Sequence, residues 1–513
     1  MPQAHLIGGA ARRCSRRWVR GPVRALLAMV LTALVLGGAV PYVSGRAYLS
    51  YLVLGERVDA SGAAVASSES RGAGGQVVQE YPQIGAVLVY ATGGFAEKLR
   101  GRPGIAAVGA TRTAPVVSPP RGVVGAGDFA AGRGSGDAVD GVERADEAPV
   151  VPDPGQGDGW NLAMVGAVSA WGDGAPVARV GADALRKVLV AVLDSGVDDT
   201  HPDLRAAVDP KASASCADGR PDARFGSWRP DPGVGESGHG THVAGIVGAA
   251  GERQGAGQGA GGQGGGQGVR GVAPGVRIGA VRLLGPLGQY YAENIVCGML
   301  WAADHGAKAV NNSYFADPWK YNCPEEPDQA AITAAVGRAV DYARAKGAVV
   351  VASAGNDGQD LGAGRTDERS PNDRVTGAAR TRYLGTECIR LPGELPGVVT
   401  VTAVNRDGRP SGYSNFGRGH VSLAAPGGDP DGGPRGAIVS DWPGGQYAAL
   451  AGTSMAAAHV TGAVAVVAAG HPEYGAERLE GVLAEAASGG CSGGPYGCGD
   501  RRYFGAGLVV LPR

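Results

Sequence analysis

Four residues whose types suit acyl-transfer chemistry stand at places where the chain is expected to turn. Ser454 follows Gly452 and Thr453 and opens an alanine-rich apolar run to residue 469, which predicts a helix with the serine at its start. Unpaired N–H groups and the positive end of the helix dipole favour an anion there. Such a serine could attack a carbonyl, although Gly-Thr-Ser before a helix is also an ordinary N-cap.

The other three residues could supply the base, its orienting group and an oxyanion donor. Asp194 ends a strand-like apolar run, His239 stands between glycines at an expected helix start, and Asn356 follows another apolar run. Each alone is more often a turn or cap residue. Together, in the order Asp, His, Asn, Ser, they indicate a nucleophilic site. His242 lies one turn further into its helix, on the packed side, and is expected to be structural.

From residue 160 onward, apolar runs typical of buried strands alternate with helical runs. This alternation predicts an α/β fold with a mostly parallel sheet flanked by helices, and a site at the carboxyl ends of the strands. Asp328 is expected to be an N-cap. The expected strands are 187–194, 277–283, 307–313, 347–353 and 397–404, and the expected helices are 239–248, 292–305, 328–346 and 454–469.

Residues 1–44 have the pattern of a targeting segment. An arginine-rich stretch precedes the nearly uncharged run 25–43, which is long enough to cross a bilayer. The positive-inside rule then predicts an exported protein, extracellular or at the cell surface. A cleaved signal peptide and a retained signal anchor both remain open, and the membrane is a partner only in the second case.

Residues 45–114 are expected to form a small α+β piece, with strands at 83–91 and 104–110 and a short helix at 94–100. A Pro/Gly-rich linker, 115–159, joins it to a large domain at 160–510. The small piece is either a pro-segment or a spacer.

Composition limits the other partners and the redox state. The net charge of −1 gives no reason to expect nucleic acid as a partner. Six of the seven cysteines lie on the exported side, where Cys323 with Cys388 and Cys491 with Cys498 are plausible disulfides. Two more, Cys216 and Cys297, could be bonded or free. No spacing of cysteines or histidines suggests a metal site.

Five motifs in order resemble the subtilisin-like serine proteases, the subtilases. They are Val-Leu-Asp194-Ser-Gly, His239-Gly-Thr-His, Gly271-Val-Ala-Pro, Ser-Ala-Gly-Asn356 and Gly-Thr-Ser454-Met-Ala. The resemblance implies a serine endopeptidase that needs no cofactor and hydrolyses exported or extracellular polypeptides through an acyl-enzyme. It also implies that residues 45–114 act as an inhibitory pro-segment.

The resemblance assigns a role to each candidate. Ser454 would be the nucleophile, His239 the general base, Asp194 the group that orients the histidine, and Asn356 a donor of the oxyanion hole. The implied substrate contacts are Gly288, Ser313, Tyr314, Phe315, Ala354 and Gly355.

Several departures from the family pattern limit these expectations. Ala458 stands where the family usually has proline, and Phe315 lies in a stretch where it usually has glycines. The specificity of the family is therefore not carried over. Asp203 matches a residue that often binds calcium, but the Gly-rich insertion 249–268 replaces the completing loop, so structural calcium is only a possibility.

Two other functions compete with the protease. A catalytically inactive relative acting as a binding or scaffold protein would keep the same fold. A lipase-like elbow at Gly490-Cys-Ser492-Gly-Gly494 needs a later histidine, and the last one is His471.

Overall fold

The computed structural model describes residues 48–116, 150–151, 159–167, 180–235, 237–251, 268–373, 381–493 and 497–512. The expected targeting segment, most of the linker and residues 252–267 of the insertion lie outside these ranges. From Tyr48 onward the chain forms one compact unit.

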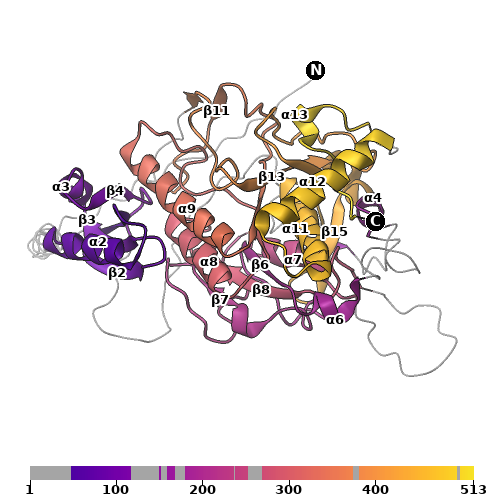
Figure 1. Cartoon of the computed structure of the whole chain (residues 1–513), viewed down its shortest axis with the longest axis horizontal. Coiled ribbons are helices and arrows are strands. Elements are labelled where there is room, and N and C mark those ends of the chain that lie inside the picture. Colours follow the sequence, from indigo (N-terminus) through magenta and orange to yellow (C-terminus); the bar gives the residue numbers. More distant parts are fainter. Residues whose placement is uncertain are drawn as a thin grey trace, which may run out of the picture. The chain divides into compact units, whose positions relative to one another are not determined.

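A parallel sheet of seven strands, in the order β14-β13-β10-β9-β6-β8-β7, forms the centre of the fold. Helices α8 and α9 lie side by side over one face, and α7 and α11 cover the other (Figure 1). The strands are β6 (Leu189–Asp194), β7 (Ala214–Ser215), β8 (Arg277–Arg282), β9 (Ala309–Asn312), β10 (Val349–Ser353), β13 (Val398–Val404) and β14 (Leu423–Pro426). The helices are α7 (His239–Gly248), α8 (Ala292–Asp304), α9 (Pro327–Ala345) and α11 (Thr453–Gly470).

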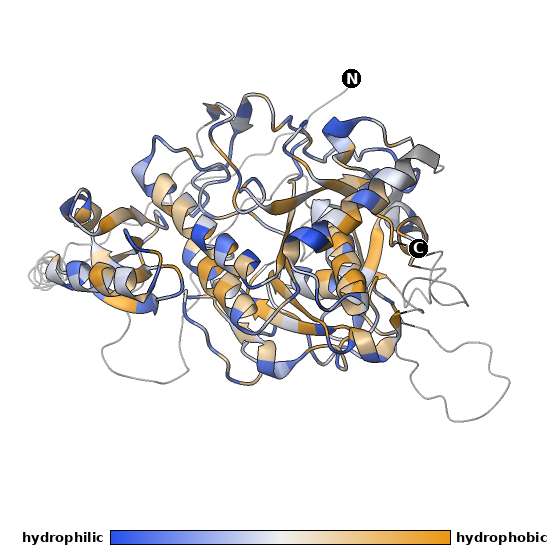
Figure 2. Cartoon of the chain, viewed as in Figure 1, coloured by the Kyte–Doolittle hydropathy of each residue, from blue (hydrophilic) through white to orange (hydrophobic). Residues whose placement is uncertain are grey.

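Alternate residues of each central strand enter different hydrophobic cores. In β6, Leu189, Ala191 and Leu193 pack with α8 and α9. Between them, Val190 and Val192 pack with α7 and α11. Both faces of the strand are thus buried, as expected of a parallel sheet between two helical layers. Figure 2 shows the resulting apolar character of the central strands and α11.

The predicted fold class is confirmed, and each of the five expected strands has a counterpart within a few residues. The edge strands β7 and β14 were not anticipated. The expected cap at Asp328 is wrong: α9 begins at Pro327, and Glu326 is the N-cap. Proline suits this first position because its fixed φ is helical and its missing N–H would have had no partner.

Helix α11 is long and apolar enough to cross a membrane, but 89% of that apolar stretch is buried inside the protein. Its surroundings are those of a core helix. Ala458, at the position of the family's usual proline, is buried within it. Alanine lets the helix continue without a kink at this point.

The N-terminal residues form a complete β-α-β-β-α-β module. Its antiparallel sheet has the order β2-β3-β1-β4. The expected strands and short helix correspond to β3, β4 and α3, whereas the first half of the module was not recognised. The elements are β1 (Tyr48–Gly55), α2 (Ala60–Gly72), β2 (Gln76–Tyr81), β3 (Ala86–Thr92), α3 (Phe95–Leu99) and β4 (Ile105–Ala110).

This N-terminal module packs against α9 through β1 and β4. The Asp328 carboxylate accepts hydrogen bonds from Ala110 N at 3.1 Å and from Arg100 Nη2 at 2.7 Å. Gly109 passes so close to the helix that a Cβ there would lie 2.6 Å from the Asp328 carbonyl oxygen. Asp328 therefore fastens the module to the helix rather than capping the helix.

Short elements complete the C-terminal half. Strands β15 (Ile438–Trp442) and β16 (Gln446–Leu450) form a hairpin, to which β5 (Val150–Val151) adds antiparallel. The remaining elements are α4 (Trp160–Met164), α6 (Ala182–Leu185), β11 (Arg365–Asp367), β12 (Arg382–Leu384), α10 (Gly433–Gly436), α12 (Ala476–Gly493) and α13 (Arg501–Phe504), with 3-10 turns at Pro210–Ala212 and Pro430–Gly432.

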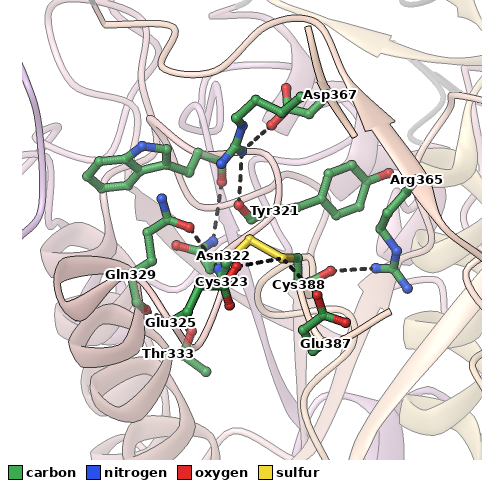
Figure 3. The surroundings of a disulfide bond; sticks show 12 residues. Tyr321, Asn322, Cys323, Glu325, Gln329, Thr333, Arg365, Asp367, Glu387 and Cys388 are labelled. Atoms are coloured by element: carbon green, nitrogen blue, oxygen red, sulfur yellow. Dashed lines mark hydrogen bonds and ion pairs between the residues drawn. A yellow bond between two sulfur atoms is a disulfide. The ribbon is translucent and has the colours of Figure 1, made fainter. Parts of the chain in front are cut away.

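Two disulfides lie within the described part of the chain. Cys323–Cys388 is confirmed, and it joins the segment before α9 to the one after β12 (Figure 3). Cys216 and Cys297 are bonded to each other, which settles the open alternative. Cys498 is also disulfide-bonded, whereas the side chain of its expected partner Cys491 lies outside the described residues.

A buried histidine links α11 to α4. His459 Nδ1 lies 2.8 Å from the Met455 carbonyl oxygen, and its Nε2 lies 2.9 Å from Asn161 Nδ2. A neutral ring satisfies both contacts, because Nδ1–H donates and Nε2 accepts. Burial lowers the pKa of His459 to about 4.

The fold should lose stability as His459 becomes protonated. Its folded-state pKa lies below the unfolded value of about 6.5, so unfolding takes up a proton, and stability falls as pH drops from 6.5 towards 4. By pH 5 this one group should cost about 2 kcal/mol. Urea unfolding from pH 7 to 5, in a Ser454→Ala background, should show a smaller loss in His459→Asn. The exposed His471→Asn is the control, and an equal loss in both variants would contradict the assignment.

Candidate functional site

The strand end of β6 and the helix start of α7 bring Asp194 and His239 together. Asp194 is fully buried, and its Oδ1 lies 2.8 Å from His239 Nδ1. The same oxygen accepts the Ser195 N–H at 2.7 Å, and the Tyr290 hydroxyl lies 3.5 Å from it. Nδ1–H therefore donates to the carboxylate, and this fixes the tautomer with Nε2 as the basic nitrogen.

Local sequence explains how the helix can start so close to the strand end. A Cβ on Gly240 would lie 2.4 Å from the Gly196 carbonyl oxygen and 3.0 Å from the Asp194 Cβ. Only glycine after His239 permits this approach. The Ser195 hydroxyl spans the gap, because it accepts the Gly240 N–H at 2.9 Å and donates to the Ser237 carbonyl at 2.8 Å.

Ser454 lies in the first turn of α11, where a helix leaves its N–H groups without internal partners. It is 9% exposed, and its hydroxyl lies 3.4 Å from the Ser313 carbonyl oxygen. Asn356 lies beside this turn: its Oδ1 accepts the Thr453 N–H at 2.9 Å and the Thr453 hydroxyl at 2.8 Å. The Asn356 Nδ2 is therefore the amide atom that can donate to an anion.

The second histidine of the motif has a different environment. His242 is fully buried, and its Nε2 lies 3.1 Å from the carbonyl oxygens of both Ile438 and Ala448. Burial, aided by the nearby His239, lowers its pKa to about 3. A neutral His242 thus ties α7 to the β15–β16 hairpin, as its position in the helix indicated.

The residues expected to contact substrate come from three segments, two of which contact the start of α11. Gly288, in the left-handed region at φ 79°, belongs to a tight turn closed by Gly285 and Gln289. Ser313 Oγ donates to the Ser454 carbonyl oxygen at 3.3 Å. Across from it, Gly355 N donates to the Thr453 hydroxyl at 3.1 Å.

The other expected contacts differ in how they are packed. The Ala354 N–H donates to Val401 O at 3.0 Å, which continues the β10 ladder. Tyr314 is buried and stacks on Tyr290 with ring centroids 4.9 Å apart. Its backbone, rather than its ring, is the part that a substrate could reach. Phe315 is only half-buried.

A cavity of about 460 Å³ lies beside Asn356. Its lining includes both members of a buried ion pair, Lys320 and Asp357, together with Arg369. Although burial opposes ionisation, Lys320 and Arg390 hold the pKa of Asp357 below its ordinary value. The space next to the expected oxyanion donor is therefore rich in charge.

Sequence reasoning missed three residues of this site. Tyr290 touches the Asp194 carboxylate, Thr453 orients the Asn356 amide, and Lys320 pairs with Asp357. Only Thr453 had a signal, since it stands directly before Ser454. The other two come from loops whose proximity depends on the tertiary fold.

The possible calcium residue Asp203 lies in a buried cluster with His201 and Asp441. Its Oδ2 accepts the Val269 N–H at 2.8 Å and the Tyr447 hydroxyl at 3.1 Å. Burial and the neighbouring Asp203 raise the pKa of Asp441 well above its ordinary value. Calcium requires six to eight oxygen ligands. The described cluster offers two carboxyl groups and one ring nitrogen, which are fewer oxygen ligands than calcium takes.

A family of known proteins matches most of the large domain. A model described as "Subtilase family" matches residues 186–507. The chain belongs to the subtilase family. This subtilase is 28% identical to M-protease of Shouchella clausii (strain KSM-K16) over 322 residues, which are 63% of this chain and 62% of that protein. Identity to Subtilisin BL of Lederbergia lenta is also 28%, over 63% of this chain and 88% of the relative.

A solved structure extends the likeness in fold. The epidermin leader peptide processing serine protease EpiP of Staphylococcus aureus matches with a TM-score of 0.61 and 19% identity. The match covers 90% of this chain and 97% of that one. Because residues 186–507 are only part of that coverage, the shared fold reaches beyond the region matched by the family model.

The two histidines of this subtilase should respond differently to substitution. His239→Ala should abolish peptide hydrolysis with little change in unfolding free energy, because the ring is at the surface of the site. His242→Ala should lower that free energy by about 2–4 kcal/mol, because it leaves a buried gap and two unpaired carbonyls. Urea unfolding of both variants in a Ser454→Ala background, with hydrolysis assayed in the Ser454 proteins, measures the two effects. The reverse pattern would refute the assignment.

Proposed function

We propose that this subtilase is an exported serine endopeptidase that cleaves polypeptides through an acyl-enzyme on Ser454. The observation that carries the proposal is the 2.8 Å contact between His239 Nδ1 and the buried Asp194 carboxylate. Such a contact orients an imidazole as a base and stabilises its protonated form. An inactive scaffold would not need that arrangement.

Each of these groups has one role in the proposed mechanism. His239 Nε2 takes the proton of the Ser454 hydroxyl as Ser454 attacks the peptide carbonyl. The Asn356 Nδ2 and the Ser454 N–H donate to the resulting oxyanion. Protonated His239 then gives its proton to the leaving amine, and water hydrolyses the ester by the same steps. None of these steps requires a cofactor.

The substrate is an extended polypeptide. The turn that contains Gly288 is exposed, and such exposed backbone can pair with an added strand. Leu287, at the tip of the turn, is 58% exposed. Two disulfides in the catalytic domain fit the oxidising compartment outside the cytoplasm. The run 25–43 supports export, with a cleaved signal peptide or a retained anchor.

Removal of the nucleophile tests the proposal. Ser454→Ala should lower kcat on an unfolded protein substrate by at least about four orders of magnitude, since the triad acts as a unit. Its melting temperature should stay nearly unchanged. A fluorophosphonate probe should label the wild type on Ser454 and leave the variant unlabelled. Equal hydrolysis by both proteins would refute Ser454 as the nucleophile.

The N-terminal module is proposed to be an inhibitory pro-segment. After β4, Arg112 stacks over the Tyr291 ring at 3.9 Å and pairs with the buried Glu293. The next two residues of the chain, Thr113 and Ala114, donate their N–H groups to the Asp373 carboxylate at 2.7 and 3.1 Å. Residues 112–114 therefore pass beside Tyr291, which follows the expected substrate contact Gly288 by three residues.

The chain should cut itself between residues 117 and 149. Its two flanks are held, by the Asp373 contacts on one side and by the pairing of β5 with β16 on the other. Mass spectrometry should show loss of the module from the wild type, while Ser454→Ala stays full length. Trimming of Ser454→Ala in a host without secreted proteases would assign maturation to another enzyme. Full activity of intact wild type would make the module a spacer.

A further inference from the structure

One arginine lies beside two of the residues expected to contact substrate, Gly355 and Phe315. A Cβ built on Gly355 would lie 3.2 Å from Arg390 Nη1. The centre of the Phe315 ring lies 5.0 Å from the Arg390 Cζ. The guanidinium is therefore next to both of these expected substrate contacts.

Arg390 lacks the partners that a buried guanidinium normally has. The residue is 7% exposed, and its Nε is sealed from solvent without a hydrogen-bond partner. Across the described ranges its guanidinium makes neither a hydrogen bond nor an ion pair; its recorded contact is the Phe315 ring. An unpaired buried charge is costly, which indicates that a ligand completes this site.

Each of the two nearby carboxylates already pairs with another cation through one of its oxygens. Glu394 accepts Arg365 Nη1 at 2.6 Å and the backbone N–H of Arg390 at 2.8 Å. Asp357 is paired with Lys320. Arg390 helps to lower the pKa of Asp357, but within the described structure its guanidinium has no direct ion pair of its own.

The position of Arg390 is fixed by its neighbours in the chain. The Leu391 carbonyl accepts the Ala316 N–H at 3.1 Å, which joins the segment that contains Arg390 to the segment that contains Phe315. Two residues earlier, Cys388 is held by the disulfide to Cys323, and its carbonyl accepts Arg365 Nη1 at 2.9 Å (Figure 3). The guanidinium is therefore presented from a rigid base.

We infer that Arg390 forms the base of the pocket for the substrate side chain preceding the cleaved bond, and that it selects glutamate or aspartate there. The inference rests on the proposed endopeptidase function and names its substrate class. A carboxylate would supply both a direct ion pair and hydrogen-bond acceptors for the guanidinium. A glutamine side chain has nearly the same shape but supplies only a hydrogen-bond acceptor. The pocket would therefore distinguish the two side chains by their charge.

Four fluorogenic peptides that differ only in the residue before the cleaved bond test this inference, with Glu, Gln, Ala or Leu at that place. In the wild type, kcat/KM for Glu should exceed that for Gln by about ten- to a hundredfold, the range for charged hydrogen bonds in a buried site. The Glu and Gln peptides are nearly the same size, so the ratio of their kcat/KM values reports the effect of the charge alone. This comparison requires no variant.

Substitution of Arg390 then locates the origin of the preference. Arg390→Met should bring the Glu/Gln ratio close to one, and Arg390→Lys should retain part of it. Arg186→Met is the matched control, because this arginine is 62% exposed in its side chain and pairs with Asp183 on α6. That variant should keep the wild-type ratio. If Arg390→Met fails to fold, the Lys variant and the wild-type ratio decide the question.

Fluorophosphonate labelling separates failure of the inference from failure of the proposed function. A wild type that is neither labelled nor active on any peptide would overturn the endopeptidase itself. A labelled wild type that prefers Gln, Ala or Leu to Glu would overturn only the role of Arg390, and a preference for Ala would mean that Arg390 merely fills the pocket. A preference for Glu that persists in Arg390→Met would also overturn that role.

Discussion

The hydrogen bond between the buried Asp194 carboxylate and His239 sets the geometry on which the rest of the site depends. It forms because the end of strand β6 and the start of helix α7 approach each other so closely that only glycine fits at position 240. The sheet order places β9 between β6 and β10, so that Ser313 and Asn356 emerge at the same edge. Helix α11 packs against β9 and β10 and carries Ser454 in its first turn. The site thus uses elements far apart in sequence, all held by one doubly buried sheet.

Much of this arrangement could be predicted from the sequence, since strands buried on both faces leave long apolar runs. The residues at their carboxyl ends could be placed on one edge for the same reason. The exceptions have local causes. Pro327 starts α9 one residue ahead of Asp328, and that carboxylate was free to bind the N-terminal module. Helix α2 went unrecognised because its Ala, Ser and Gly residues give a weak apolar periodicity.

Other features left no signal in the sequence because they arise only from tertiary contacts. Cys216 and Cys297 are separated by 81 residues, and no spacing rule indicates their bond. Arg390 lies in a loop of ordinary composition. Its importance comes from two contacts, with the Phe315 ring and next to Gly355, and from nearby carboxylates that already have other partners. Whether a charged side chain has a partner depends on the folded structure, so it cannot be predicted from the sequence one residue at a time.

On both sides of residues 117–149 the chain is bound to the compact unit, and this affects the rate at which the chain can cut itself. A segment attached at both ends to one compact unit meets that unit's own active site at an effective concentration on the order of millimolar, whatever the dilution of the protein. Maturation by this route is first order, and competing substrates in the surroundings delay it little. The segment also contains acidic residues, among them Asp128, Asp137 and Glu143. An enzyme that selects acidic side chains would then produce several closely spaced amino termini instead of one.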